Sequence, residues 1–384
     1  MKFFHISDLH LGKRLNDFSL IEDQRYALTE IACMAAFEEK PDAVVIAGDI
    51  YDKSVPTAEA VTLFDEFLNQ LYSNNINVII ISGNHDSAER VSFGASLMNS
   101  SGVYIAPPYS TEPYQYTVDL EDEFGTVHFH LLPFIKPVNV RQAHPELEIS
   151  SYNDAIKVAV EDMEINETER NILVTHQFVT GSVRCDSEAV SVGGTDNVDA
   201  EIFDQFDYVA LGHIHNPQSI SRESVRYCGS PLKYSFSEAN VTKSITIVEV
   251  GEKGKNCINI RTADLSPLHD LKEIKGSYDE LTLKSFYIGT SYMTDYMHIT
   301  LTDEEDVPDA ISKLRPIYKN IMKLDYDNTR TRTGFSVITN ETSEEYTPSE
   351  LFSDFYEKVN GKPMSDDQSS VIEDIISKIW RDEQ

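Results

Sequence analysis

Two stretches decide the fold of this chain: AVVIAGD at residues 43–49 and NVIIISGNHD at residues 77–86. Each begins with a short, uninterrupted apolar run, which is typical of a strand buried on both faces of a sheet. Each run then gives way to glycine and polar side chains, as expected where a strand ends in a loop. Between them, residues 57–72 carry apolar side chains at helical spacing. This β-α-β order predicts a layered α/β domain whose functional loops follow the strand ends.

The same pattern continues on both sides of these stretches. Residues 2–7 predict a strand and residues 23–38 a helix. Further strands are expected at residues 126–132, 171–175, 208–211 and 244–250. Their less regular spacing indicates a second sheet packed on the first. We therefore expect two packed β-sheets flanked by helices, ending near residue 265.

A smaller unit is expected after the main domain. Residues 297–302, 307–318 and 321–326 predict a strand, a helix and a strand. A polar, threonine-rich segment then has the composition of a linker, and two helical patterns follow it. The expected organisation is an α/β domain at residues 1–265, a small α+β domain at 266–327, a linker at 328–346 and a helical region at 347–384.

Composition argues against several classes of protein. The 32 basic and 64 acidic residues give a formal net charge of -32, which by itself argues against a nucleic-acid partner because phosphate contacts need Lys and Arg. The four scattered cysteines form no CxxC pair, which fits a reducing compartment. No apolar run approaches the roughly 20 residues of a membrane span, and residues 1–8 lack a signal-peptide layout. We expect a cytoplasmic protein without membrane contact.

Five short segments carry side chains that can bind metal ions, and all five follow predicted strands. They are Asp8-Leu9-His10, Gly48-Asp49, Gly83-Asn84-His85-Asp86, Val174-Thr175-His176 and Gly212-His213-Ile214-His215. Side chains two positions apart on an extended chain point to one face, so Asp8 and His10 can reach the same ion. Oxygen and nitrogen donors without thiolate suit Mn²⁺, Fe²⁺ or Zn²⁺ more than Ca²⁺.

Any one of these segments alone can occur by chance, but the set favours one shared site. Together the segments hold five of the eleven histidines. Asp49 is the natural bridge between two cations because a carboxylate has two oxygens. Two divalent ions roughly 3.5–4 Å apart can activate water and clamp phosphoryl oxygens. The sequence therefore predicts a two-metal phosphoesterase.

These five segments together resemble the signature of the calcineurin-like metallophosphoesterase superfamily. Within it, HISDLHLG at residues 5–12, AGDIYD at 47–52, SGNHDS at 82–87 and GSPLKYSFSE at 229–238 are similar to the bacterial SbcD nuclease family. The resemblance is strong up to about residue 240. It implies that residues 266–327 form a capping domain, and that residues 347–384 attach to the coiled-coil ATPase partner SbcC.

The resemblance also implies a role for each matching residue. One metal ion would be held by Asp8, His10, Asp49 and His215, and the other by Asp49, Asn84, His176 and His213. His85 would approach the phosphate as the catalytic residue, with Asp86 supporting it. Some relatives carry a second histidine at the position of Asp52, so this chain departs from their pattern there.

The activity implied is hydrolysis of DNA phosphodiesters in an SbcCD-type DNA repair complex. It comprises 3′→5′ exonuclease action on duplex ends and endonuclease action on single strands or hairpins, with Mn²⁺ as the cofactor and with or without stimulation by SbcC. A homodimer within a heterotetramer is expected. Candidates for local phosphate contacts near the motif loops are Lys13, Arg14, Arg90, Arg184 and Lys233, although any of them could instead be a solvated surface charge.

Two alternatives stay open on the sequence alone. The first is a phosphoesterase of the same fold that acts on small phosphodiesters or phosphoproteins, which the acidic net charge favours. Protein phosphatases of this superfamily carry an arginine before the Asn-His pair, whereas this chain has Ser82-Gly83 there. The second is a non-catalytic scaffold, which the intact ligand set argues against.

Overall fold

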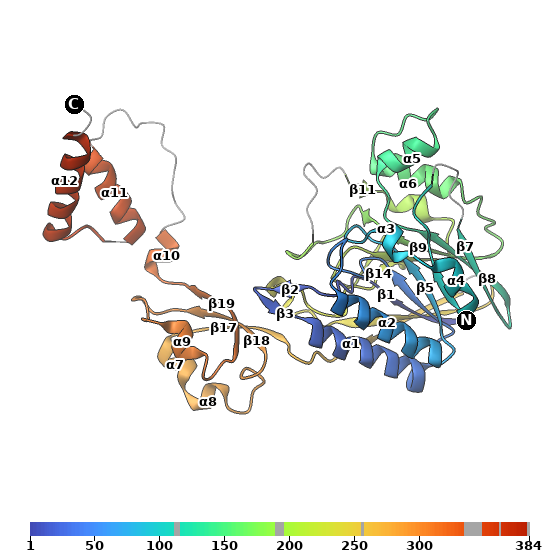
Figure 1. Ribbon diagram of the computed structural model, residues 1–384, viewed down its shortest axis with the longest axis horizontal. Coiled ribbons are helices and arrows are strands. Elements are labelled where there is room, and N and C mark those ends of the chain that lie inside the picture. The colour runs from blue at the N-terminus through green and yellow to red at the C-terminus, as the bar shows by residue number, and fades with distance from the viewer. Residues whose placement is uncertain (111–115, 189–195, 255–256, 334–347, 361, 382–384) are drawn as a thin grey trace. The chain divides into compact units, whose positions relative to one another are not determined.

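The computed structural model describes residues 1–110, 116–188, 196–254, 257–333, 348–360 and 362–381. The chain divides into two compact units, Met1–Asp270 and Leu271–Gln384. The expected α/β class, with several sheets flanked by helices, is confirmed (Figure 1). The division between the units falls a few residues beyond the expected end of the first domain at residue 265.

The first sheet of the first unit contains both stretches that predicted the fold. Its six strands, in spatial order, are β16 (Ile258–Asp264), β15 (Ser244–Val250), β1 (Lys2–Ile6), β4 (Ala43–Ala47), β5 (Asn77–Ile81) and β6 (Val103–Ile105). Strands β1, β4, β5 and β6 run parallel, whereas β15 is antiparallel to β1. Every residue of β4 is buried, as its uninterrupted apolar run predicts.

The second sheet also has six strands. Their order is β13 (Gln218–Ile220), β14 (Arg222–Tyr227), β12 (Tyr208–Gly212), β9 (Arg170–His176), β8 (Gly125–Leu132) and β7 (Thr117–Asp122). One apolar cluster joins side chains of both sheets, including Phe3, Val45, Phe129 and Ile172. The rings of Phe3 and Phe129 meet edge to face at 5.4 Å. The two sheets are therefore packed face to face, as the sequence predicted.

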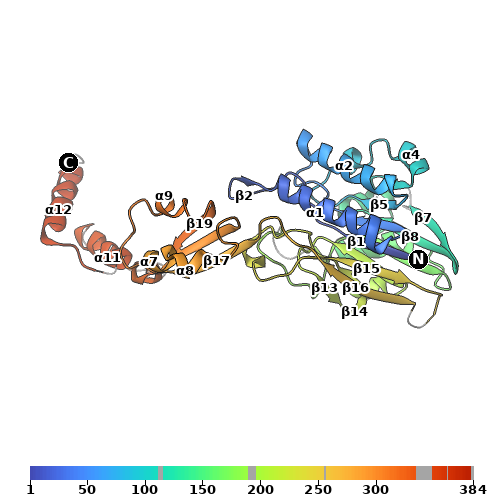
Figure 2. The same cartoon turned by 90° about the horizontal axis from the view of Figure 1, so that it is seen from below.

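Helices cover the two outer faces of this sandwich. Helices α1 (Ile21–Cys33) and α2 (Ala58–Ser73) lie side by side over the first sheet (Figures 1 and 2), and a π-helical segment, η1 (Met34–Glu39), extends α1. Thr57 caps α2 by accepting the backbone N–H of Ala60 at 3.2 Å. The second sheet is covered by α5 (Pro137–Ala143) and α6 (Tyr152–Glu161).

The remaining elements of this unit are short and belong to its loops. They are β2 (Arg14–Leu15), β3 (Phe18–Ser19), α3 (Ala88–Val91), α4 (Ala95–Met98), η2 (Asn99–Ser101), β10 (Phe178–Val179), β11 (Asn197–Val198), η3 (Ala200–Phe203) and η4 (Phe236–Glu238).

The second unit contains the expected strand, helix and strand, and one further strand completes a three-stranded parallel sheet. Its strands are β17 (Leu271–Gly276), β18 (Tyr296–Leu301) and β19 (Asn320–Tyr326). The sequence prediction missed β17 because lysine and glutamate interrupt its short apolar pattern. The helices beside the sheet are α7 (Tyr278–Thr282), α8 (Lys284–Tyr287) and α9 (Ala310–Leu314). Helix α9 is shorter than predicted at both ends, because it begins only after Pro308 and Asp309 and already ends at Leu314.

The rest of the second unit is helical where the structure describes it. Helix α10 (Thr329–Thr333) occupies the start of the expected linker, and residues 334–346 of that linker lie outside the described residues. Helices α11 (Pro348–Asn360) and α12 (Asp366–Arg381) match the two predicted helical patterns. Among the described residues, no helix is long and apolar enough to cross a membrane.

Candidate metal centre

The five predicted segments come together where β1, β4, β5, β9 and β12 end. Backbone hydrogen bonds join the first two segments, from Asp8 N to Gly48 O at 3.0 Å and from His10 N to Asp49 O at 3.0 Å. The second sheet joins them because the backbone N–H of His213 donates to the Asp8 carboxylate at 3.1 Å. The carboxyl ends of parallel strands from both sheets thus form one site.

The backbone of this site is strained at several of the proposed ligands. Asp8, His10, Asp49 and His213 have φ values of 54°, 44°, 50° and 104°. Residues with a Cβ rarely adopt positive φ, and such conformations cluster at functional sites where the surrounding structure holds them. The five segments were predicted from their residue types. The backbone strain is a second sign of function, and it does not depend on residue type.

Neighbouring segments of the site approach so closely that glycine is required at two positions, Gly83 and Gly212. A Cβ on Gly83 would overlap the carboxylate of Asp49, and a Cβ on Gly212 would overlap the carbonyl oxygen of Ala47. Both contacts join segments that follow different strands. The glycines therefore permit the strand ends to approach closely enough for their side chains to share a site.

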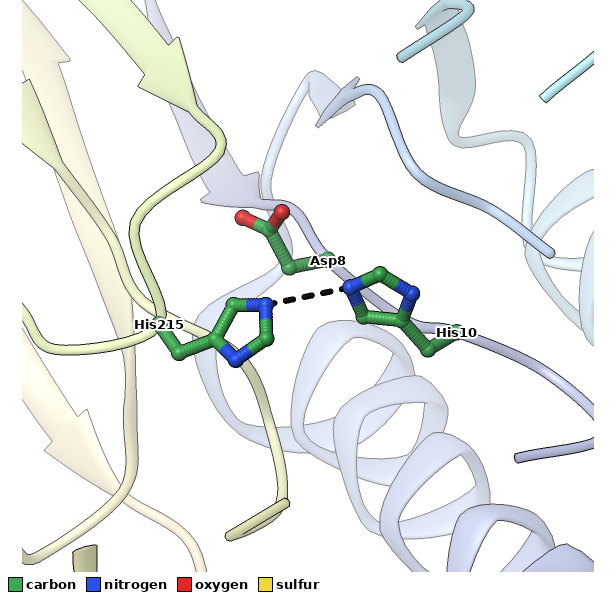
Figure 3. A group of neighbouring side chains, drawn as sticks. All are labelled: Asp8, His10 and His215. Atoms are coloured by element: carbon green, nitrogen blue, oxygen red, sulfur yellow. Dashed lines mark hydrogen bonds between the residues drawn. The ribbon is translucent and has the colours of Figure 1, made fainter. Parts of the chain in front are cut away.

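Three of the predicted ligands form a group that we call site A: Asp8, His10 and His215. Their ligand atoms lie within 4.8 Å of one another. Nε2 of His10 is 3.1 Å from Nε2 of His215. Figure 3 shows Asp8 and His10 on the segment after β1, meeting His215 from the loop after β12. All three side chains are buried.

Three others form a second group, site B: Asn84, His176 and His213. Oδ1 of Asn84 lies 3.1 Å from Nε2 of His176 and 2.8 Å from Nδ1 of His213. Nδ1 of His176 is 2.8 Å from the carbonyl oxygen of Ala47. Since a carbonyl only accepts, this contact places the ring proton on Nδ1 and leaves Nε2 turned towards Asn84.

Asp49 lies between the two groups. Its Oδ2 is 3.7 Å from Nε2 of His10 in site A and 3.4 Å from Nε2 of His176 in site B. Its Oδ1 accepts the backbone N–H of His85 at 2.8 Å. The carboxylate is thus held in place and faces both sites, which is the geometry that a bridging ligand requires.

The donor set and its electrostatics fit divalent cations. Burial raises the pKa of Asp8 to about 7, although the nearby His176 opposes the shift. Burial also lowers the pKa of His10 and of His213 to about 3, so both rings are neutral. Neutral imidazoles keep a lone pair for a metal, and buried carboxylates need a counter-charge. These residues therefore offer neutral nitrogen and carboxylate ligands, and they carry too little positive charge to balance the buried carboxylates.

Asp49 and His176 partly compensate each other. Burial favours the neutral ring of His176, but the Asp49 carboxylate outweighs it and raises the pKa of His176 to about 9. Burial likewise opposes ionisation of Asp49, yet the charge of His176 holds the pKa of Asp49 below its usual range. The ring of His176 then carries a second proton, on Nε2. A divalent ion would replace this Nε2 proton, because the nitrogen that binds a metal must be deprotonated.

His85 lies at the edge of the site and is half-buried. Its Nδ1 is 3.0 Å from the backbone carbonyl oxygen of Asp52, and its ring meets the His10 ring edge to face at 4.8 Å. The carbonyl fixes the ring with its proton on Nδ1 and leaves Nε2 for another contact. The contact uses the backbone of Asp52, so a different side chain at this position does not remove it.

Asp86 was expected to support His85, and its carboxylate contacts backbone groups of the two loops that surround His85. The Asp86 carboxylate accepts backbone N–H groups of Gly83 at 2.9 Å, Ile50 at 3.1 Å and Tyr51 at 3.0 Å. Among the described residues, no hydrogen bond joins it to the His85 ring. Three backbone donors satisfy the carboxylate, so Asp86 fixes the loops after β4 and β5, and His85 benefits only indirectly.

The five basic residues proposed for phosphate contacts all have partners in the protein. Lys13, Arg184 and Lys233 form ion pairs with Asp52, Asp196 and Asp270 at 2.9, 2.9 and 2.7 Å. Arg14 donates to the carbonyl of Asp17, and Arg90 to that of Ser54. Lys233 also donates to the carbonyl of Ala239 at 2.6 Å. A phosphate contact from Lys233 would therefore have to replace both an ion pair and a hydrogen bond to a carbonyl, which makes it the weakest of these candidates.

Several residues that the sequence did not single out surround the proposed ligands. Tyr234 and Gln24 both donate to the carbonyl of Leu9, and Gln24 also donates to that of His10 at 2.7 Å. Glu188 accepts the backbone N–H of His215 at 2.6 Å. Only Tyr234 had a signal, since it lies in the stretch at residues 229–238 that resembles the nuclease family.

Comparisons with known proteins agree with this architecture. Residues 1–217 match the calcineurin-like phosphoesterase family, and residues 267–360 match the type 5 capsule protein repressor C-terminal domain. The chain is 33% identical to the SbcD subunit of the nuclease SbcCD from Staphylococcus epidermidis (strain ATCC 12228 / FDA PCI 1200) over 386 residues, which cover 99% of both chains. The chain therefore belongs to the calcineurin-like phosphoesterases and, within them, to the family of SbcD nuclease subunits.

Proposed function

We propose that this chain is the nuclease subunit of an SbcCD-type complex and hydrolyses DNA phosphodiesters with two divalent metal ions, Mn²⁺ being the preferred cofactor. The observation that carries the proposal is the position of Asp49, whose Oδ2 lies within 3.7 Å of a ligand nitrogen in each site. Asp8, His10, Asp49 and His215 would hold one ion, and Asp49, Asn84, His176 and His213 the other. The similarity to an SbcD nuclease subunit over nearly the whole chain supports the substrate.

The residues of the site suit phosphodiester hydrolysis. When bound, two such ions lower the pKa of water and neutralise charge on the phosphoryl oxygens. His85 would contact the phosphate through Nε2, because the carbonyl of Asp52 occupies its Nδ1. With a second proton on Nε2, the ring would donate a hydrogen bond that stabilises the developing negative charge, or would transfer that proton to the leaving 3′ oxygen. Asp86 would keep the loops after β4 and β5 in register with each other.

The second unit would serve the complex rather than the chemistry. Residues 267–360 match a domain distinct from the phosphoesterase family, which supports the role of a capping and partner-binding region. We propose that α11 and α12 attach to the ATPase subunit SbcC, and that two copies of this chain join two copies of SbcC in the cytoplasm. Within such a complex the activity would be 3′→5′ exonuclease action on duplex ends and endonuclease action on single strands and hairpins.

The net charge of -32 is the observation that favours the alternative, a phosphoesterase for small diesters. Net charge does not determine the potential inside one cleft, however, where bound cations are the largest local charges. The SbcC partner would then supply much of the nonspecific attraction to the DNA backbone.

An activity assay distinguishes the two functions. The full chain, with and without SbcC and ATP, is incubated with Mn²⁺ and either a labelled duplex or a small chromogenic phosphodiester. The proposal predicts cleavage of the duplex, and loss of that cleavage in Asp49→Ala. Hydrolysis of the small diester with intact DNA under every condition would support the alternative instead.

A further inference from the structure

The His215 ring of site A ends a chain of buried and half-buried polar side chains that no part of the proposed chemistry uses. Nδ1 of His215 lies 2.7 Å from Oγ of Ser187, and this Oγ lies 2.8 Å from Oε1 of Glu238. Oε2 of Glu238 forms an ion pair with Nζ of Lys243 at 2.5 Å. His215, Glu238 and Lys243 are 2%, 0% and 5% exposed, so these contacts are largely shielded from water.

The direction of each hydrogen bond follows from the groups involved. Glu238 is paired with an ammonium group, and a carboxylate can only accept, so the single proton of Ser187 points to Glu238. The hydroxyl oxygen must then accept from His215, which places the imidazole proton on Nδ1. The thiol of Cys185 also lies 2.9 Å from Oγ of Ser187, but a sulfur atom is a much weaker acceptor than a carboxylate.

The remaining nitrogen of His215 points into site A. Nε2, left without a proton, lies 3.1 Å from Nε2 of His10. The loop around His215 is held from two further sides, because Glu188 accepts its backbone N–H at 2.6 Å and Lys243 donates to its carbonyl at 2.7 Å. Lys243 therefore contacts both His215 and Glu238.

We propose that Ser187 and Glu238 are positioning residues for His215, holding it as the Nδ1–H tautomer so that its Nε2 lone pair is presented to the cation of site A. This inference rests on the proposed metal site and assigns a role to side chains outside the ligand set. Contacts of this kind raise the basicity of a ligand histidine, and their loss costs about 10–100-fold in metal affinity.

The effect is confined to one of the two sites. In site B, His176 donates its Nδ1 proton to the backbone carbonyl of Ala47, which substitution of Ser187 leaves intact. Loss of the Ser187 hydroxyl therefore weakens site A about tenfold and leaves site B within about twofold of its original affinity.

Ser187→Ala is the decisive variant because Ser187 is half-buried and its removal leaves the Glu238–Lys243 ion pair in place. Ser187→Thr keeps the hydroxyl. Ser182→Ala is the matched control, since Ser182 is also half-buried and its hydroxyl donates to a backbone carbonyl, that of Val179, at 2.7 Å.

Two measurements are made on the full-length variants without DNA. Mn²⁺ binding is followed by calorimetry, and the His215 tautomer is read from imidazole ¹⁵N shifts of metal-free protein, assigned with His215→Gln.

The proposal predicts the Nδ1–H tautomer in wild type, a shift towards Nε2–H in Ser187→Ala, and a loss of about tenfold at one Mn²⁺ site. Ser187→Thr should restore both readouts, and Ser182→Ala should change neither. An unchanged tautomer and unchanged affinity in Ser187→Ala would overturn the inference while leaving two Mn²⁺ sites in wild type. A wild-type chain that binds no Mn²⁺ would overturn the proposed function together with the inference.

Discussion

Sites A and B meet at Asp49 but hold their histidines in different ways. In site B, Nδ1 of His176 lies 2.8 Å from the backbone carbonyl oxygen of Ala47. In site A, Nδ1 of His215 lies 2.7 Å from the side-chain hydroxyl of Ser187. The first contact follows from the packing of two sheets, whereas the second depends on side chains from distant loops. Site A is therefore the half of the centre that a conservative substitution can weaken separately.

The largest effect should come from Asp49→Ala, which removes the group that both sites share. Each cation supplies several kcal/mol of transition-state stabilisation, so loss of about 4 kcal/mol would lower kcat about 1000-fold. The loss of kcat is measured as cleavage of a labelled duplex by the full complex with Mn²⁺. Asp65→Ala, which removes an exposed carboxylate on α2, should keep wild-type activity. Near-normal cleavage by Asp49→Ala would contradict the shared-ligand assignment.

His85→Ala separates chemistry from metal binding. Among the described residues, no hydrogen bond joins Nε2 of His85 to a ligand of either site, so both sites should bind Mn²⁺ as in wild type. Removal of an acid or a charge-stabilising group should lower kcat about 100-fold. Parallel measurement of kcat and of Mn²⁺ affinity tests this. If His85→Ala lost metal as readily as His10→Ala, His85 would have to be counted among the ligands.

Gly83→Ala should disturb both sites at once, through sterics alone. A Cβ at this position would overlap the Asp49 carboxylate, so we expect Mn²⁺ binding to weaken about tenfold at each site, as for other changes that misplace a ligand. The matched control is Gly251→Ala, where the nearest atom to an added Cβ is 3.7 Å away. Calorimetric titration of both variants gives the comparison, and equal affinities in the two would argue against close packing at Asp49.

Metal removal should change the thermal stability of the chain, and this change reports on both sites together. A ligand present at about 100 times its dissociation constant stabilises the folded state by about 2.7 kcal/mol. Two filled sites give about 5.4 kcal/mol, so for a chain of this size chelation should lower Tm by about 7 °C. Ser187→Ala should show a smaller difference between its loaded and chelated forms, because site A contributes less. Identical melting curves with and without chelator would mean that no cation links the strand ends.

Much of this centre could be predicted because its ligands follow buried strands. The apolar runs before Asp49 and Asn84 place these residues at the sheet edge, and the parallel order of β1, β4 and β5 brings them together. The uninterrupted apolar run that indicates burial of both strand faces is a local property of the sequence. For that reason the prediction of two packed sheets flanked by helices succeeded.

The supporting residues were not predictable in the same way. Ser187 and Glu238 are 51 positions apart in sequence, and neither lies at a strand end. Glu238 closes the stretch at residues 229–238 that resembles the nuclease family, but that resemblance assigned no role to it. Asp86 was expected to support His85, but its hydrogen bonds to three backbone N–H groups depend on how the loops after β4 and β5 meet, which the sequence alone does not give. Strand β17 was missed because only tertiary packing of residues such as Ile274 buries its apolar face.

Electron paramagnetic resonance of the Mn²⁺-loaded full chain can establish whether two cations share Asp49. Two Mn²⁺ ions roughly 3.5–4 Å apart are magnetically coupled, so a chain carrying two Mn²⁺ should give the spectrum of a coupled pair. Asp49→Ala should give isolated Mn²⁺ signals or no bound Mn²⁺. A wild-type chain that binds a single Mn²⁺, or two uncoupled ions, would contradict a centre bridged by Asp49.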